Sequence, residues 1–539
     1  MLFTQYIKDL KTEFSGYNAG QLSKDLLAGL TVSAVALPLA LAFGVSSGAD
    51  AASGLITAII AGLVMSMLAG AFYQISGPTG AMAAILMSIV AKYQMQGVFL
   101  ATLMAGALLL IAGLLHLGKL TSFIPAPVIT GFTSGIAIII ALGQIDNFFG
   151  TTSEGSSAIA KLLSYRTLGF PINPAAVAIG LFVVLFMAFF PKKWNSVVPA
   201  SLVGIILATA ASMVMGLHVE TVGEIPKTLL PESRLSLAAI RWEQVEGLIG
   251  PAVSIALLGM IESLLCGASA GRMTGKRLNS DQELIAQGLG NMLVPFFGGI
   301  PATAAIARTS VAIKSGAQTR LTGVFHAVGL LLAMFVLGPV MSQIPLAALA
   351  GVLMVTAWRM NEWSAIRFFF SHHFKGALFK YFVTMLATVL LDLTMAILIG
   401  VSVGLVLFIC RSANIEVTAE DVDLERLGVS DSKGTYNWSV VYVTGPLFFV
   451  TAEAVQQKLE ELAEQELIIF SLRGVSMVDI TAVNMLEEYY KTETAKGKKI
   501  IFSSIQPSVM RMFERFGLVD TVGQDAFYFS VDRVLKELL

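Results

Sequence analysis

Long stretches of the chain contain no Asp, Glu, Lys or Arg, and this feature limits the possible folds more than any other. These stretches are residues 26–49, 51–91, 93–118, 120–145, 167–191, 194–219, 284–307 and 321–358. A helix needs about 20 consecutive apolar residues to cross the hydrocarbon core of a bilayer. Only 13% of the 539 residues are charged, whereas the share in soluble proteins is about 25%. The sequence therefore predicts a polytopic α-helical membrane protein.

The same composition argues against several classes of function. The net charge is -1, so the chain has no basic excess that would indicate a nucleic-acid partner. The two cysteines and five histidines lack the spacing of a metal site, and the sequence contains no Walker A motif. We therefore expect no metal, no cofactor and no enzymatic activity.

The apolar runs and the prolines and glycines between them predict fourteen membrane segments. The predicted segments are 25–48, 52–71, 79–92, 98–115, 123–145, 172–190, 196–216, 247–270, 282–297, 303–315, 319–341, 344–360, 377–392 and 394–411. They divide into two repeats of seven, over residues 25–216 and 247–411. Because seven is an odd number, the second repeat is expected to insert with inverted topology.

The two predicted repeats contain a matching interruption. Residues 77–84 read Gly-Pro-Thr-Gly-Ala-Met-Ala-Ala, and residues 300–307 read Ile-Pro-Ala-Thr-Ala-Ala-Ile-Ala. Each run places a proline and several small residues at the start of a short predicted helix. Interrupted apolar segments at corresponding places in two halves indicate a transporter binding site.

Two such helix starts favour an anion as the ligand. The first turn of a helix exposes unpaired N–H groups and carries a partial positive charge. Small residues such as Gly80 and Ala305 let a ligand approach the backbone, and Pro78 and Pro301 come just before the two predicted starts. Small residues also allow helices to pack closely, which is the alternative interpretation.

Two ionisable residues lie within apolar sequence. Arg308 follows the second interruption, and Glu262 lies at the centre of the predicted helix 247–270. Ionisable residues are costly inside a membrane and are candidates for function. Arg308 suits a planar oxyanion, although a snorkelling or structurally paired arginine is the alternative. Glu262 suits a proton carrier, and a fixed ion pair with Arg308 is the competing interpretation.

The composition becomes that of a soluble protein after about Arg411. Strand-like runs then alternate with helix-like runs, which predicts a small α/β domain. The strand-like runs are Val440–Val443, Leu467–Leu472, Lys499–Ser503 and Phe527–Ser530. The predicted organisation is an N-terminal segment (1–24), a membrane domain (25–411), a linker (412–435) and an α/β domain (436–539).

The charged residues between the predicted helices set the expected orientation. Lysines and arginines such as Lys24, Lys192 and Arg277 fall mostly on one side, whereas the opposite loop 217–246 is rich in glutamate. The positive-inside rule then predicts that both termini and the α/β domain are cytoplasmic.

The sequence resembles the SulP family of sulfate-permease-type anion transporters over nearly the whole chain. The matching motifs are Asp25-Leu-Leu-Ala-Gly-Leu-Thr31, Gly77-Pro78-Thr79, Phe123-Ile-Pro-Ala-Pro-Val-Ile-Thr-Gly131, Ile261-Glu-Ser-Leu264, Glu283-Leu-Ile-Ala-Gln-Gly-Leu-Gly-Asn291 and Gly298-Gly-Ile-Pro-Ala-Thr-Ala-Ala-Ile-Ala-Arg-Thr309. The C-terminal domain resembles the STAS domain of that family, with Gly445-Pro446-Leu447-Phe448-Phe449 and Leu472-Arg-Gly-Val-Ser-Met-Val-Asp-Ile-Thr481.

The resemblance implies a core and a gate domain that work by an elevator motion, and a homodimer to which the STAS domain contributes. It also implies a bacterial inner-membrane location. Family substrates include sulfate, bicarbonate, chloride and dicarboxylates. By motif, the resemblance puts the anion site on Phe43, Thr79, Ala305, Ile306, Ala307 and Arg308, to which the helix-start argument adds Gly80. Glu262 matches the acidic position of the helix 247–270.

We therefore expect secondary active transport of a small inorganic or carboxylate anion, coupled to protons. Glu rather than Asp at position 262 resembles the proton-coupled bacterial branch. Cys266 and Ile306 stand where sodium-coupled bicarbonate members carry hydroxyl residues, which argues against sodium coupling. Anion exchange and uncoupled, chloride-type transport are the alternatives. The expected partners are the anion, a proton and the lipid bilayer.

Overall fold

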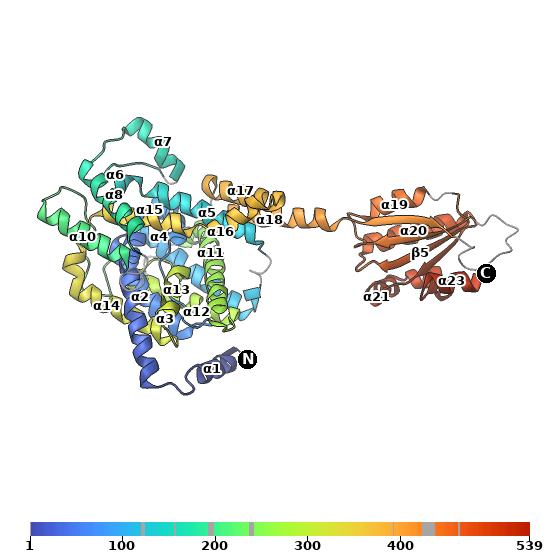
Figure 1. Ribbon diagram of the computed structural model, residues 1–539, viewed down its shortest axis with the longest axis horizontal. Coiled ribbons are helices and arrows are strands. Elements are labelled where there is room, and N and C mark those ends of the chain that lie inside the picture. Colours follow the sequence, from blue (N-terminus) through green and yellow to red (C-terminus); the bar gives the residue numbers. More distant parts are fainter. Residues whose placement is uncertain are drawn as a thin grey trace. The chain divides into compact units, whose positions relative to one another are not determined.

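The computed structural model describes residues 2–119, 124–155, 158–191, 199–236, 242–391, 393–422, 437–461 and 464–538. The chain forms two compact units, Met1–Gly404 and Leu405–Leu539 (Figure 1). Each unit is described by itself below.

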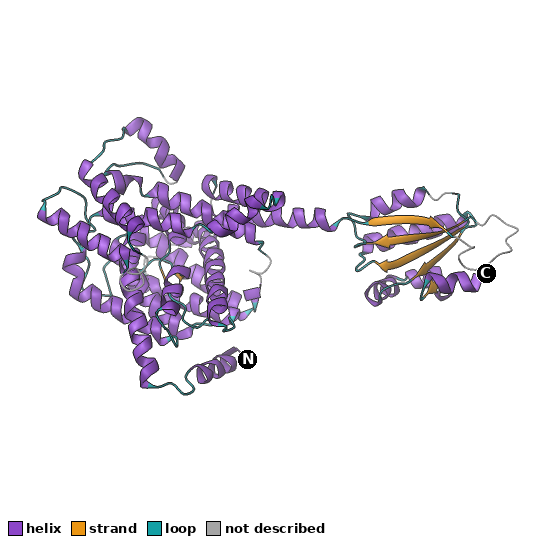
Figure 2. Cartoon of the chain, viewed as in Figure 1, coloured by secondary structure: helices purple, strands orange, loops and turns teal. Residues whose placement is uncertain are grey.

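The first unit is almost entirely helical (Figure 2). The first set of helices is α1 (Leu2–Glu13), α2 (Ala19–Ser46), α3 (Ala51–Leu68), α4 (Gly80–Leu114), α5 (Ala126–Gly143), α6 (Ile145–Phe149), α7 (Ala158–Leu168), α8 (Pro174–Phe189) and α10 (Ala200–Val214). The second set is α11 (Trp242–Thr274), α12 (Ser280–Leu293), α13 (Ile306–Lys314), α14 (Leu321–Met341), α15 (Leu346–Met360), α16 (Trp363–Ser371), α17 (Lys375–Leu390) and α18 (Leu393–Ser412).

Length and composition make this unit a membrane-spanning one. Among the described residues, seven helical segments are long and apolar enough to cross a bilayer, and α8 and α10 are apolar but shorter. The predicted multi-span helical class is therefore confirmed. Each of the fourteen predicted segments contains a helix, but many of these are shorter than a full span, so the count of fourteen stays a prediction.

Several predicted helix ends differ from the structure by a few residues, such as that of α2, which begins at Ala19 and not at residue 25. Two further differences change the elements themselves. The segments 79–92 and 98–115 belong to one element, α4, which is interrupted where Gln94 leaves helical geometry (φ 58, ψ -177). The predicted helix 303–315 begins later, at Ile306, because Thr303 and Ala304 form a short strand, β2. The prediction also lacked the short helices α1, α6, α7 and α16, which are too short or too polar to read as membrane segments.

Helices from the two halves of the sequence pack side by side: α4 against α12, α2 against α14, α5 against α17 and α8 against α15. Glycines bring the α4 and α12 backbones into direct contact. A Cβ atom on Gly106 would lie 2.7 Å from the Met292 nitrogen, and one on Gly288 would lie 2.6 Å from the Leu110 nitrogen. Such close approach is how membrane helices gain packing energy without a hydrophobic driving force.

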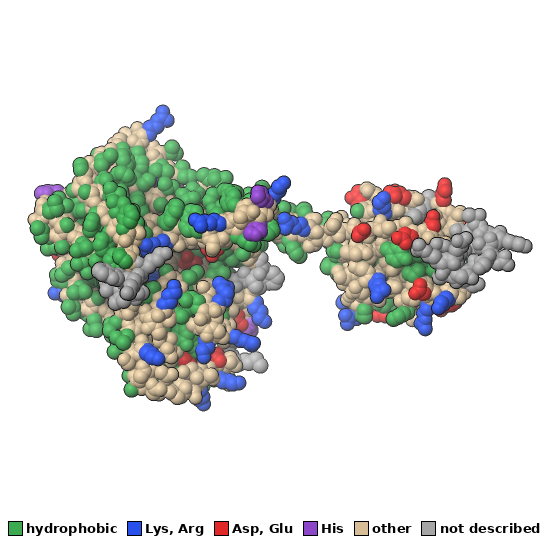
Figure 3. All heavy atoms as spheres, viewed as in Figure 1, with side chains coloured by type: hydrophobic (Ala, Val, Ile, Leu, Met, Phe, Trp, Pro, Cys, Tyr) green, Lys and Arg blue, Asp and Glu red, His purple; other side chains and the backbone are tan. Residues whose placement is uncertain are grey.

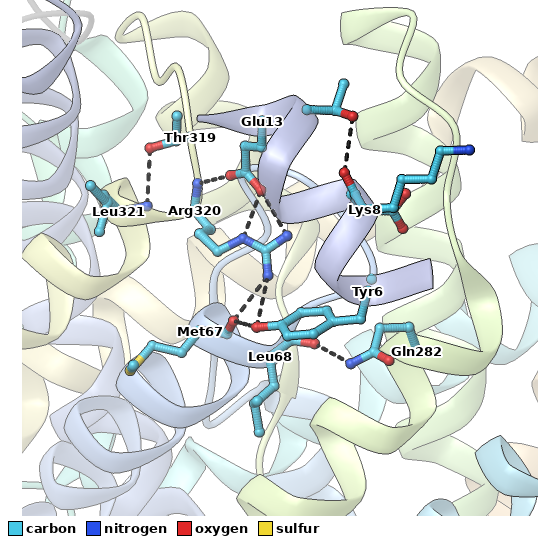
Figure 4. Close-up of polar contacts among 12 residues, drawn as sticks. Tyr6, Lys8, Glu13, Met67, Leu68, Gln282, Thr319, Arg320 and Leu321 are labelled. Carbon is cyan, nitrogen blue, oxygen red and sulfur yellow. Dashed lines mark hydrogen bonds and ion pairs between the residues drawn. The ribbon is translucent and has the colours of Figure 1, made fainter. Parts of the chain in front are cut away.

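A buried ion pair attaches α1 to the rest of the unit (Figure 4). Arg320, at the start of α14, donates from Nε to Glu13 Oε2 at 2.7 Å and from Nη1 to the Met67 carbonyl at 2.9 Å. The Tyr6 hydroxyl donates to the same carbonyl at 2.6 Å. Both partners of the pair are less than one-tenth exposed. Removing one member of a buried pair costs about 3–5 kcal/mol, so this pair fixes α1 against the ends of α3 and α14.

Asp25 joins the start of α2 to the start of α14. Its fully buried carboxylate accepts hydrogen bonds from the backbone N–H groups of Gln318 and Thr319, and from the hydroxyls of Thr319, Thr322 and Tyr17. Burial and the hydrogen bond to Asp25 raise the pKa of Tyr17 to about 12. The five hydrogen bonds that its carboxylate accepts explain why Asp25 tolerates burial.

The surface of the first unit separates apolar from basic regions. Figure 3 shows hydrophobic side chains over α5, α8 and α15, whereas Lys and Arg side chains gather over α1, α12 and α13. Exposed cations at that end include Lys8, Lys11, Lys276, Arg277 and Lys314. Lysines and arginines concentrated beside membrane segments are the pattern from which the positive-inside rule assigns orientation.

The second unit contains a five-stranded sheet in the order β3-β4-β5-β6-β7, in which only the β3–β4 pair is antiparallel (Figure 2). Its strands are β3 (Glu416–Asp421), β4 (Trp438–Thr444), β5 (Leu467–Gly474), β6 (Lys499–Ser503) and β7 (Phe527–Tyr528). The helices α19 (Ala452–Glu460), α20 (Ile480–Ala495) and α21 (Pro507–Phe516) pack on one face, and α23 (Val531–Leu538) packs on the other. α22 (Leu518–Val522) follows α21.

The predicted α/β domain is confirmed, and all four predicted strands are present. The sheet also contains a fifth, unpredicted strand, β3, which lies inside the segment 412–435 predicted as a linker. Residues 423–436, which include the end of the predicted linker and the predicted start of the α/β domain at residue 436, lie outside the described residues.

Candidate functional site

The two interrupted segments meet in a short antiparallel pair of strands. β1 (Ser76–Gly77) precedes α4, β2 (Thr303–Ala304) precedes α13, and Gly77 lies opposite Thr303 in the register. The Ala305 N–H extends the pairing by donating to the Ile75 carbonyl at 2.9 Å. This pairing brings together two helix starts that are more than 200 residues apart in the sequence.

The two helix starts differ in how their N–H groups are satisfied. Thr79 caps α4, because its hydroxyl accepts a hydrogen bond from the Met82 N–H at 3.4 Å. Ala305 is the corresponding residue of α13, and no side chain caps this helix within the described structure. The first-turn N–H groups of α13 are thus left for solvent or a ligand, which is the arrangement that binds anions.

Glu262, from α11, connects the two segments. Its Oε2 atom accepts hydrogen bonds from the Thr79 hydroxyl at 2.9 Å and the Thr303 hydroxyl at 2.6 Å. Among the described residues, no ion pair joins Glu262 to Arg308. The alternative of a fixed Glu262–Arg308 pair is therefore wrong for this structure, since hydroxyl groups satisfy the carboxylate instead.

Arg308 is the third residue of α13, in its first turn, and is almost fully buried. Its Nη2 atom donates to the Pro78 carbonyl at 2.5 Å, while its Nη1 atom has no hydrogen-bond partner in the described structure. A Cβ atom on Gly77 would lie only 2.5 Å from Nη1. The guanidinium therefore spans from α13 to the β1–α4 junction, and one of its N–H groups stays uncommitted.

The other predicted site residues lie around the same two helix starts. A Cβ atom on Gly80 would approach the Phe43 ring to 3.1 Å and the Ile140 side chain to 2.4 Å, so Phe43 and Gly80 are neighbours. Phe43 and Thr79 are buried, whereas Ile306 is 47% exposed and Ala307 is also exposed. The arrangement is a polar centre with one accessible side at the start of α13.

A stripe of buried polar side chains on α12 supports the paired strands. Glu283, Gln287 and Asn291 are spaced by four residues and so lie on one helix face. The Gln287 amide donates to the Ser76 hydroxyl at 2.9 Å and to Glu283 at 2.8 Å. The Asn291 side chain accepts from the Ala302 N–H at 2.8 Å and donates to its carbonyl at 2.9 Å. These bonds fix the position of both strands relative to α12.

Sequence reasoning missed the parts played by Thr303 and by this stripe. Thr303 counted only as a small residue, yet its hydroxyl makes the shorter of the two bonds to Glu262. Glu283, Gln287 and Asn291 appeared only as a motif. The available signal was their spacing of four residues within an apolar helix, which indicates a single polar face.

Replacing Gly77 by alanine is expected to displace the Arg308 guanidinium, because the new Cβ atom would lie 2.5 Å from Nη1. Gly77 also has φ 159°, a conformation that side-chain-bearing residues rarely adopt, so the variant should lose some stability as well as distorting the site. Anion affinity should fall several-fold, as measured by substrate titration of the purified, folded protein. Gly180→Ala, at a glycine packed against Phe148 in α6, controls for general loss of packing, and equal losses in both variants would contradict the prediction.

A membrane unit in which two broken helices from different halves of the chain meet at a charged centre, joined to a small α/β domain, defines a membrane transporter. The chain belongs to the sulfate permease family, whose model matches residues 22–388. A STAS domain model matches residues 430–533. The resemblance inferred from the motifs is thus confirmed for both parts of the chain.

Similar proteins span nearly the full length of this chain. A protein of Bacillus subtilis described as a putative sulfate transporter is 34% identical over 97% of this chain and 98% of its own length. A bicarbonate transporter of Picosynechococcus is 32% identical, covering 95% of this chain and 94% of its own.

Solved structures show the same fold. The overall structure of SLC26A9 covers 100% of this chain and 94% of that chain with a TM-score of 0.84 at 18% identity. The transmembrane domain of a cyanobacterial bicarbonate transporter covers 71% of this chain and 97% of that chain with a TM-score of 0.64 at 31% identity.

Proposed function

We propose that the protein is a secondary active transporter, not an enzyme, that moves a small anion together with protons across the bacterial inner membrane. The observation that carries the proposal is the antiparallel β1–β2 pair, which joins the starts of α4 and α13 beside Arg308. Membership of the family supports the substrate class, and the named relatives point to sulfate and bicarbonate.

The anion is proposed to bind between the two helix starts. Each helix start contributes about half an elementary charge, and Arg308 adds a full one. The contacts would come from Phe43, Thr79, Gly80, Ala305, Ile306, Ala307 and Arg308. The uncommitted Nη1 group of Arg308 and the uncapped N–H groups of α13 support this assignment, because both are donors that an oxyanion can satisfy.

The proton is proposed to bind at Glu262. Its carboxylate accepts a hydrogen bond from Thr79, the capping residue of α4. A negative charge at that point opposes the binding of an anion nearby, and neutralising it by a proton removes the repulsion. Proton binding and anion binding therefore favour each other, and such coupling between two sites is reciprocal. That reciprocity lets a proton gradient drive anion uptake.

The proposed motion is an elevator movement of a core domain against a gate domain, with fourteen spans in two inverted repeats. Within one group α4 packs with α12 and α2 with α14, and within the other α5 packs with α17 and α8 with α15. The contacts between the groups, of α4 with α5 and of α2 with α15, are less extensive, which supports two such groups. The protein is proposed to form a homodimer with both termini and the STAS domain in the cytoplasm.

Uptake into proteoliposomes tests the proposal. With an inward proton gradient, we expect accumulation of at least one of sulfate, bicarbonate, fumarate or succinate, and collapse of the gradient should abolish it. Replacement of sodium by potassium should leave uptake unchanged. Accumulation that depends on an opposing internal anion but not on the proton gradient would favour exchange, and absence of flux for every anion would overturn transport itself.

A further inference from the structure

A cavity of about 900 Å³ lies beside α16, away from the site described above. Its lining residues are Trp358, Trp363, Ile366, Arg367, Phe370 and Ser371. All but Trp358 belong to α16, at positions i, i+3, i+4, i+7 and i+8, so one face of this helix turns toward the cavity. α16 connects α15 to α17 and packs against α17 (Figure 1).

The cavity walls are aromatic and accessible. Trp358 is 66% exposed. Its ring centroid lies 4.5 Å from that of Trp363 with the two rings tilted by 40°, and the Trp363 Nε1 donates to the Trp358 carbonyl. Phe370 is 49% exposed and packs on Phe382 of α17. Accessible tryptophans at the ends of membrane helices are typical of the bilayer interface, where the ring contacts lipid and the N–H finds a polar partner.

One uncommitted cation faces the same cavity. Among the described residues, no hydrogen bond or ion pair engages the exposed Arg367 guanidinium. The nearest acid in the sequence, Glu362, instead accepts a hydrogen bond from the Thr130 hydroxyl at 2.7 Å. The segment 359–380 contains four lysines and arginines against that single acid. The exposed guanidinium of Arg367 is therefore free to bind an anion from outside the described chain.

We propose that this cavity binds an anionic phospholipid. The phosphodiester would pair with the planar fork of Arg367, and the acyl chains would lie along Trp358, Trp363 and Phe370. A second copy of the chain is a poorer fit, because a two-fold interface places a patch against itself and would oppose two cation-rich segments.

Tryptophan quenching by brominated lipids tests the proposal on the full-length protein in detergent micelles. Brominated phosphatidylglycerol should quench at concentrations several-fold lower than brominated phosphatidylcholine. The double variant Trp358→Phe/Trp363→Phe should remove most of that selective quenching, because both tryptophans line the cavity. Arg367→Gln should weaken phosphatidylglycerol binding about tenfold, the range expected for one charged hydrogen-bond pair. Arg277→Gln, at an exposed arginine that does not line the cavity, is the matched control and should retain the preference.

Four results would overturn the proposal. Equal quenching by the two lipids in the wild type would reduce the cavity to general lipid-exposed surface. An unchanged preference in Arg367→Gln would remove the assigned contact. Relief of quenching by millimolar inorganic phosphate would identify a free-phosphate site, and loss of quenching as protein concentration rises would put a second copy there.

Discussion

Replacing Glu262 by glutamine is expected to abolish anion accumulation driven by a proton gradient. Glutamine has nearly the same size, and its carbonyl oxygen can still accept the hydrogen bonds that Thr79 and Thr303 donate to Oε2 at 2.9 and 2.6 Å. The site should therefore keep its shape. An amide cannot take up and release a proton near neutral pH, so the proposed coupling between proton and anion is lost.

Accumulation in Glu262→Gln proteoliposomes should fall to the level of wild-type liposomes without a gradient. Downhill flux and binding should persist, with affinity changed by less than about fivefold, or about 1 kcal/mol. Binding should also become independent of pH, since the titrating group is gone. Glu246→Gln, at an exposed glutamate on the same helix, is the control. A Glu262→Gln protein that still concentrates substrate on a pH gradient would show that another group carries the proton.

The difference between Glu262 and Thr303 illustrates what the sequence could and could not predict about the site. Glu262 and Arg308 stand out because a charged residue is rare in apolar sequence, and the structure brings both to the same pair of segments. The contact of Thr303 with Glu262 depends on a two-residue strand that pairs with a segment over 200 residues away. No local pattern indicates such a pairing. The alternative of a fixed Glu262–Arg308 ion pair could likewise be excluded only from the structure, in which hydroxyl groups satisfy the carboxylate.

The fold was predictable where one physical signal dominated. Apolar runs located the membrane helices, and alternation of strands and helices located the STAS domain. β3 was missed because it is an edge strand with exposed, mostly polar residues, so it lacks the apolar alternation of a half-buried strand. α16 was missed because nine residues that combine aromatic side chains with an arginine resemble neither a membrane span nor a soluble helix.

Replacing Arg308 by alanine is expected to weaken anion affinity by about 10- to 100-fold, the range of one or two hydrogen bonds to a charged group. The helix starts of α4 and α13 supply only partial charges, and Arg308 is the only Lys or Arg in residues 284–313. Its Nη1 group has no partner among the described residues and is therefore available to a ligand. The loss should appear as a raised KM for uptake and a raised Kd for binding.

Arg308 also holds the Pro78 carbonyl at 2.5 Å, so part of the effect of Arg308→Ala could come from a displaced β1–α4 junction. Arg308→Lys separates the two contributions. A lysine can satisfy the single Pro78 carbonyl and keep the charge, but it lacks the planar fork that binds an oxyanion through two N–H groups. Lysine should therefore restore folding fully and affinity only in part.

The thermal stability of the purified variants distinguishes a lost anion contact from a displaced β1–α4 junction. Lys314→Ala removes the other cation of α13, which is exposed, and should leave both affinity and stability near wild type. If Arg308→Ala loses stability but binds the anion as tightly as wild type, Arg308 serves packing alone. The anion would then depend on the helix starts, and the uncapped N–H groups of α13 would be the next donors to test.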